Sequence, residues 1–105
     1  MDLHRLADLL AEQSAGPKAY LEFIRSTALS VGLYVLHVGD TDMQQPHRED
    51  EIYVVMSGRS RFTAGDETRE VNAGDTIFVA AGVPHRFRDI VDELRLIVVF
   101  APPES

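Results

Sequence analysis

After residue 18 the sequence is divided into short apolar runs that alternate with a period of two residues and are separated by turn-forming residues. Leu29, Val31 and Leu33, for example, fall on one side of an extended chain. The dipeptide Gly65-Asp66 tolerates positive φ and favours a hairpin. The spacing predicts about eight strands, at 19–25, 29–38, 52–56, 59–63, 68–71, 76–79, 84–88 and 94–100. Many short strands without intervening helices indicate an all-β sandwich or barrel.

The residues before this region have a different period and predict one short helix over 2–13. Leucines recur there at helical spacing, Asp2 is placed to cap the first turn, and Gly16-Pro17 ends the pattern. The leucines are Leu3, Leu6, Leu9 and Leu10. We therefore expect residues 1–18 to form a helix and linker and residues 19–105 to form a β-barrel domain.

Length and charge exclude several classes of protein. The 105 residues suit one domain with one core. The 17 acidic and 10 basic residues give a net charge of −7, which argues against a nucleic-acid partner because nucleic acid is bound mainly through Lys and Arg. No apolar run approaches the roughly 20 residues of a membrane-spanning helix, and the first 13 residues lack the pattern of a secretory signal. We expect a cytoplasmic protein with no membrane partner.

The absence of cysteine restricts the chemistry. It excludes disulfides, thiolate metal ligands and a cysteine nucleophile. The sequence also has no Gly-x-Ser-x-Gly elbow and no Gly-rich phosphate loop, so neither a serine hydrolase nor a nucleotide-binding site is expected. A metal ion would have to be bound by His, carboxylate or amide side chains, a set that suits Fe, Mn, Ni, Co or Zn.

One group of potential ligands lies just before a strongly apolar strand. Gaps of five, one, three and six residues separate Gly39, Gln45, His47, Glu51 and Gly58. Gln45 and His47 are two residues apart, so in an extended chain they point the same way. Glu51 would lie about 13 Å from His47 in a straight chain, too far to share one ion. The chain must therefore bend between His47 and Glu51 if both are ligands.

A second group surrounds His85. Gaps of five, one, two and three residues separate Gly74, Ala80, Gly82, His85 and Asp89. His85 is 38 residues after His47 in the sequence. A closed antiparallel barrel would allow the two histidines to meet across its interior.

The two groups resemble the two sequence motifs of the cupin superfamily, G-x5-H-x-H-x3-E-x6-G and G-x5-P-x-G-x2-H-x3-N. The resemblance to a small single-domain cupin implies a double-stranded β-helix, or jelly-roll, barrel with one divalent metal ion inside its mouth. The implied metal ligands are Gln45, His47, Glu51 and His85. Three positions depart from the motifs: Gln45 replaces a histidine, Ala80 a proline and Asp89 an asparagine. A glutamine oxygen is a neutral and weaker donor than imidazole, so Gln45 is either a ligand or a hydrogen-bonding neighbour of the ligands.

Two further residues are candidates for the pocket around the metal. Tyr53 shares the parity of His47 and Glu51 and is expected either to line the pocket or to lie in the core. His37 precedes Gly39 on a predicted strand, where it would be either a barrel histidine with a hydrogen-bond partner or a pocket residue.

The resemblance leaves more than one function open. A metal-dependent enzyme of oxygenase, isomerase or lyase type, acting on a small organic molecule, is the leading hypothesis. The alternatives are a ligand-binding or sensing module without catalysis, and a barrel that binds no metal. Cupin barrels commonly pair, so the resemblance also implies a homodimer, with the strand at 19–25 as a candidate for exchange.

Overall fold

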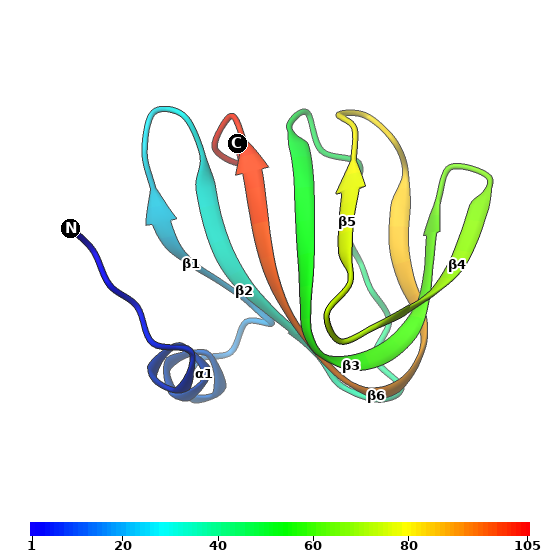
Figure 1. Ribbon diagram of the computed structural model, residues 1–105, viewed down its shortest axis with the longest axis horizontal. Helices are drawn as coiled ribbons and strands as arrows, with labels where there is room; N and C mark the ends of the chain where they lie inside the picture. The colour runs from blue at the N-terminus through cyan, green and yellow to red at the C-terminus, as the bar shows by residue number, and fades with distance from the viewer.

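The computed structural model describes residues 1–105 and contains one helix and six strands (Figure 1). The elements are α1 (Leu6–Ala15), β1 (Tyr20–Arg25), β2 (Ser30–Leu36), β3 (Asp50–Ala64), β4 (Glu67–Asn72), β5 (Thr76–Val79) and β6 (His85–Ala101). All strand pairs are antiparallel, in the order β1-β2-β6-β3-β4, with β5 paired to β3. Figure 1 shows β3 and β6 curving strongly along the lower side, so that the sheet rolls into the predicted jelly-roll barrel.

The strand count differs from the prediction because two expected breaks lie inside continuous strands. The runs at 52–56 and 59–63 are both part of β3, and those at 84–88 and 94–100 are both part of β6. The pairing of β3 with β6 shifts register around Gly58, which has φ of 99°. A Cβ atom at Gly58 would lie 2.2 Å from the carbonyl oxygen of Glu93. Ser57-Gly58 is therefore an irregularity within a bent strand and not a turn, as is typical of β-bulges.

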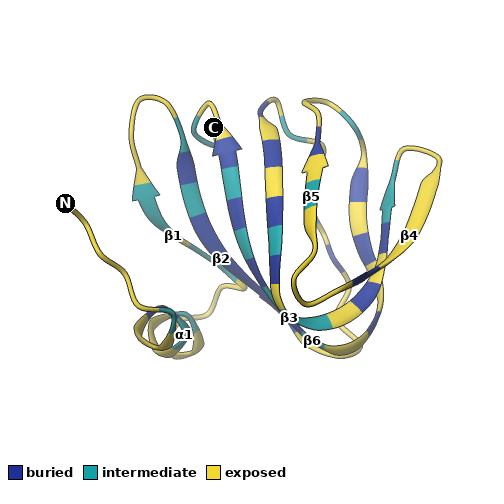
Figure 2. Cartoon of the chain, viewed as in Figure 1, coloured by how far each residue is buried: buried dark blue, intermediate teal, exposed yellow.

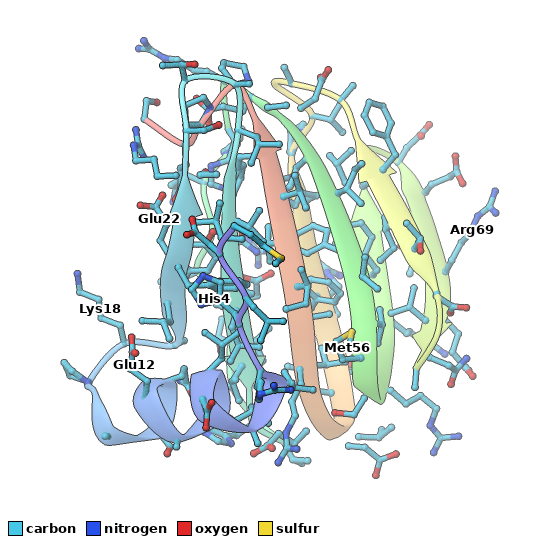
Figure 3. All side chains as sticks on the ribbon, turned by 60° about the vertical axis from the view of Figure 1, so that its left-hand side comes forward. His4, Glu12, Lys18, Glu22, Met56 and Arg69 are labelled. Atoms are coloured by element: carbon cyan, nitrogen blue, oxygen red, sulfur yellow. The ribbon has the colours of Figure 1, made fainter.

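The helix is shorter at its start than predicted. It begins at Leu6, and the residue at its N-cap position is Arg5, whose side chain makes no capping hydrogen bond, so the expected cap at Asp2 is wrong. Leu9 is buried against Leu33 and Val35, which lie on the outer face of β2. Figure 3 shows the helix lying at the base of β1 and β2, with Lys18 pointing outward from the link to β1. No helix in the structure is long and apolar enough to cross a membrane.

The core fills the inside of the barrel. Figure 2 shows buried and exposed residues alternating along β3, which follows from the period of two in a strand with one face inward. Tyr53 and Val55 of β3 pack with Leu94, Leu96 and Val98 of β6 in a cluster of 13 buried residues. The outward residues of the same strands include Met56, which is 43% exposed.

The same alternation aims two of the predicted ligands into the barrel. Glu51 shares the inward face of β3 with Tyr53, and His85 shares the inward face of β6 with Phe87. Glu51 is the second residue of β3 and His85 the first residue of β6, and Figure 1 shows these two strand starts at the same open end of the barrel. Curvature of the sheet thus brings residues that are distant in sequence to one mouth.

Candidate metal centre

His47, Glu51 and His85 meet at the mouth of the barrel. One ligand atom from each lies within 4.8 Å of the others. Nε2 of His85 is 2.9 Å from Oε1 of Glu51, and Nε2 of His47 is 4.0 Å from the same oxygen. The bend expected between His47 and Glu51 is present, since residues 48 and 49 form a bend before β3 begins.

The ring of His85 is oriented by the backbone. Its Nδ1 lies 2.8 Å from the carbonyl oxygen of Val83, which can only accept, so Nδ1 carries a proton and donates it. In the neutral ring Nε2 then carries a lone pair that faces Glu51. Burial lowers the pKa of His85, but the adjacent carboxylate of Glu51 and the Val83 carbonyl outweigh this effect, and the pKa is raised overall.

Glu51 is a buried carboxylate without a hydrogen-bond donor. It is 1% exposed, and neither of its oxygens receives a hydrogen bond of suitable direction, although Nε2 of His85 is close. An isolated buried carboxylate is strongly destabilising unless a cation compensates it. This orphaned group fits a bound metal ion.

Gln44, and not Gln45, has its side chain at this cluster. Oε1 of Gln44 is 3.1 Å from Nε2 of His47 and 3.1 Å from the hydroxyl oxygen of Tyr53. Gln45 is exposed and makes no hydrogen bond to the cluster, although it lines a polar pocket of about 330 Å³ that also contains Gln44 and His85. Residues 41–47 form no regular strand, so the two-residue parity that favoured Gln45 does not apply to them.

Asp42 organises the loop that carries Gln44. It is 1% exposed, and its Oδ1 accepts a hydrogen bond of 2.8 Å from the Tyr34 hydroxyl. Its Oδ2 accepts from the backbone N–H of Phe87 at 2.9 Å and from Nε2 of Gln44 at 3.2 Å. The backbone N–H of Gln44 also points to Oδ1, at 3.3 Å. A local signal was thus present in the sequence, because Asp side chains commonly bond the backbone two residues later.

Tyr53 lies beneath the cluster. It is fully buried, and its hydroxyl oxygen is 3.1 Å from Gln44 Oε1 and 3.1 Å from His85 Nε2. Burial, followed by the neighbouring charge of Glu51, raises the pKa of Tyr53 well above its ordinary value. The hydroxyl therefore keeps its proton and acts as a single donor to this group of acceptors.

His37, the other predicted pocket residue, lies elsewhere. It follows the end of β2, its side chain is 64% exposed, and its Nδ1 is 2.6 Å from Oε1 of Glu93. It contributes no atom to the cluster of ligand atoms at the barrel mouth. The structure therefore places it on the surface, paired with a carboxylate.

Sequence reasoning missed Glu104, which reaches the centre from the segment after β6. Its Oε2 is 3.5 Å from Nδ1 of His47, on the opposite side of the ring from Glu51. Two hydrogen bonds hold this segment: the Glu104 N–H donates to Ser30 Oγ at 3.0 Å, and Ser105 Oγ donates to Glu49 Oε2 at 3.1 Å. Nothing in the local pattern around Pro102-Pro103 indicated this return.

A groove of about 440 Å³ leads to the His47 side of the cluster. Its walls are mainly apolar, and Gln44, His47 and Glu104 lie along it. The lining residues are Lys18, Ala19, Tyr20, Tyr34, Met43, Gln44, His47, Val98, Phe100 and Glu104. The groove has the size and apolar character of a small-molecule pocket.

Comparisons with known proteins agree with this architecture. The family model of the cupin domain matches residues 32–101. An uncharacterised protein of Streptomyces coelicolor is 50% identical over 105 residues, covering all of both chains. Among solved structures, TT1209 of Thermus thermophilus has a TM-score of 0.79 and 25% identity, with 98% of this chain and 99% of that chain covered.

A second similar structure is an enzyme. The DMSP lyase DddQ of Ruegeria pomeroyi has a TM-score of 0.67 and 25% identity, with 72% of this chain but 39% of that chain covered. The match of the family model to two thirds of the chain, together with the jelly-roll barrel, shows that the chain belongs to the cupin family.

Proposed function

We propose that this protein binds one divalent transition-metal ion on His47, Glu51 and His85 and uses it as an enzyme acting on a small organic molecule. The observation that carries the proposal is the buried carboxylate of Glu51, whose oxygens receive no hydrogen bond although it faces two histidine rings. Two imidazoles and one carboxylate are a common ligand set for Fe(II) and related ions, and leave positions open for other ligands.

Counting donors and acceptors supports a cation at this position. Glu51 offers only acceptor atoms, Gln44 directs its Oε1 inward, and the neutral ring of His85 presents the Nε2 lone pair. The Tyr53 hydroxyl and Nε2 of His47 can each supply at most one proton to this group. Acceptors outnumber donors, and a metal ion compensates the surplus because it is bound by lone pairs.

When bound, the metal ion would act as a Lewis acid that polarises an oxygen of the substrate. The residues of the chain would orient the reactants. His85 is oriented by its Nδ1–H bond to Val83, and the Tyr53 hydroxyl holds a proton within hydrogen-bonding distance of Gln44 Oε1. Lyase, isomerase and oxygenase chemistry are all compatible with such an arrangement, and the similarity to a DMSP lyase supports an enzymatic function.

The groove beside His47 indicates the kind of substrate. Tyr20, Tyr34 and Phe100 form edge-to-face contacts, with ring centroids 6.1 Å and 6.3 Å apart. Such walls favour a substrate with an apolar body and one oxygen-bearing group directed at the metal. A non-catalytic module that binds the same kind of molecule is the second candidate, favoured by the mainly apolar lining of the groove.

Metal analysis tests the metal site. The protein is purified without added metal, analysed for transition metals, and titrated with Fe(II), Mn(II), Ni(II), Co(II) and Zn(II). We expect about one ion per chain in the wild type and none in His47→Ala or His85→Ala. His37→Ala is the matched control, since His37 is exposed and paired with Glu93. Equal metal content in all four proteins would overturn the assignment.

Turnover separates the enzyme from the binding module. The metal-loaded protein is screened against small carbonyl, carboxylate and enol compounds, with product detected by mass spectrometry. Product that depends on His47 and His85 supports the enzyme. Saturable binding without product, seen as a perturbed metal spectrum, supports the module.

We also propose that two copies of the chain form a homodimer through β1. β1 is one edge of the sheet, so its outer backbone groups are free for pairing with a second copy. Light scattering at several concentrations tests this. Ala19 directs its backbone at β2, so the backbone N–H of Glu22, of opposite parity, faces outward, and Glu22→Pro should dissociate the dimer because proline removes that donor. A monomer at all concentrations would contradict it.

A further inference from the structure

We infer that Gln44, through its side-chain oxygen Oε1, is a fourth ligand of the metal ion, and that Asp42 is the residue that positions it. The inference rests on the proposed metal site. It differs from the motif, which has a ligand at the position of Gln45.

The distances support one shared ion. When two donor atoms each lie about 2.1 Å from one ion and the donor–metal–donor angle is a right angle, the two donor atoms are about 3 Å apart. Gln44 Oε1 is 3.1 Å from His47 Nε2, and Glu51 Oε1 is 2.9 Å from His85 Nε2. The four atoms thus form two pairs with the separation expected of neighbouring ligands.

The orientation of the Gln44 amide follows from its other contact. The oxygen and nitrogen of a glutamine side chain are distinguished by their hydrogen-bond partners. Nε2 of Gln44 lies 3.2 Å from Oδ2 of Asp42, and a buried carboxylate can only accept. The NH2 group must therefore face Asp42, which turns the oxygen towards His47 and Tyr53.

Asp42 is itself held on several sides. The Tyr34 hydroxyl bonds to Oδ1 and the Phe87 backbone N–H bonds to Oδ2. The carboxylate is 1% exposed, so it does not exchange these partners for water. Gln44 is thereby oriented before any metal binds, which lowers the entropy cost of using a flexible, neutral ligand.

Gln45 provides a matched control in the chain. It is chemically identical, adjacent in sequence and exposed, and it makes no hydrogen bond to His47, Glu51 or His85. Comparing the two glutamines therefore isolates the position of the side chain.

The experiment titrates metal-free protein with Co(II), which reports affinity and, through its visible absorption, the number and type of ligands. We expect Gln44→Ala to weaken Co(II) binding roughly 10–100-fold and to change the shape of the absorption spectrum. Gln45→Ala should match the wild type in both. Asp42→Asn should also weaken Co(II) binding. The amide introduced at position 42 can donate as well as accept, so it no longer forces the NH2 group of Gln44 to face it.

Circular dichroism of each metal-free variant excludes misfolding, and the spectral change distinguishes a lost ligand from a general loss of stability. If Gln44→Ala binds Co(II) with the affinity and spectrum of the wild type while His47→Ala does not bind, the role of Gln44 is overturned and the metal site stands. If Gln45→Ala alone changes the spectrum, the motif position is the ligand and the inference is wrong. If the wild type binds no metal, both proposals fail.

Discussion

The carboxylate of Asp42 accepts a hydrogen bond of 2.9 Å from the backbone N–H of Phe87, 45 residues later in the sequence. This bond ties the loop before β3 to the first residues of β6. Because His47 follows the loop and His85 begins β6, the bond sets the relative position of the two histidines as well as that of Gln44.

Asp42→Ala should destabilise the protein strongly. The change leaves the buried Phe87 N–H and Tyr34 hydroxyl without acceptors, which we expect to cost about 3 kcal/mol of the free energy of unfolding. Urea unfolding of the metal-free protein measures this. Asp66→Asn, in the exposed turn before β4, is the control and should be close to neutral. A loss below about 1 kcal/mol for Asp42→Ala would mean that this carboxylate does not hold the loop.

Gly58→Ala should also be destabilising, for a backbone reason. Gly58 has φ of 99°, and an added Cβ would lie 2.2 Å from the Glu93 carbonyl oxygen. We expect a cost of about 2 kcal/mol or more, measured as a shift of the thermal midpoint. Gly16→Ala is the comparison, since the nearest atoms to a Cβ there are 3.8 Å away. Equal midpoints for the two variants would contradict the bulge at Gly58.

Glu104→Gln should weaken metal binding without unfolding the protein. The carboxylate lies 3.5 Å from Nδ1 of His47 and favours the tautomer that leaves Nε2 free for the ion. We expect an affinity loss of up to about tenfold, measured by competition with a chromophoric chelator. Glu12→Gln, on the exposed side of the helix, should have no effect. Unaltered affinity in Glu104→Gln would show that the contact does not orient the ring.

The pair of His37 and Glu93 should affect acid stability and not metal binding. Burial alone would raise the pKa of Glu93, but its bonds to Arg95 and His37 outweigh this and lower it. Because the pKa of Glu93 is lower in the folded state than in the unfolded state, its ionised carboxylate stabilises the fold at pH values above the ordinary pKa of a carboxyl. This contribution is lost as the pH falls through the folded-state pKa. His37→Ala should therefore reduce the loss of stability on acidification, by no more than about 0.5 kcal/mol at this exposed site. Unfolding curves at several pH values measure the effect, and an altered metal affinity would show that His37 belongs to the centre after all.

Metal binding should raise the thermal midpoint. A ligand at 100 times its dissociation constant stabilises the folded state by about 2.7 kcal/mol. Adding the preferred ion to metal-free protein should therefore raise the midpoint, and a chelator should reverse the rise. His85→Ala should show no rise, whereas His4→Ala, on an exposed position before the helix, should behave as the wild type. A rise of equal size in both variants would mean that the ion binds elsewhere.

Local patterns in the sequence were sufficient for the class of fold. The period of two in runs such as 76–79 predicted β5 with its observed bounds, because both of its ends are closed by turn residues. The same local reasoning divided β3 at Gly58, since a glycine at a turn and a glycine at a bulge are alike in sequence. Only the pairing with β6 distinguishes them.

The site divides in the same way. His47, Glu51 and His85 follow from motif spacing, and strand parity explains why Glu51 and His85 point inward. The contact of Gln44, and not Gln45, with His47 and Tyr53 depends on the tertiary structure, because the side chains in an irregular loop are directed by long-range bonds such as that of Asp42 to Phe87. The same holds for Glu104, which reaches His47 only because the segment after β6 bonds to Ser30. Sequence by itself determines residue types and local periodicity, whereas contacts between residues tens of positions apart depend on how the sheet curves.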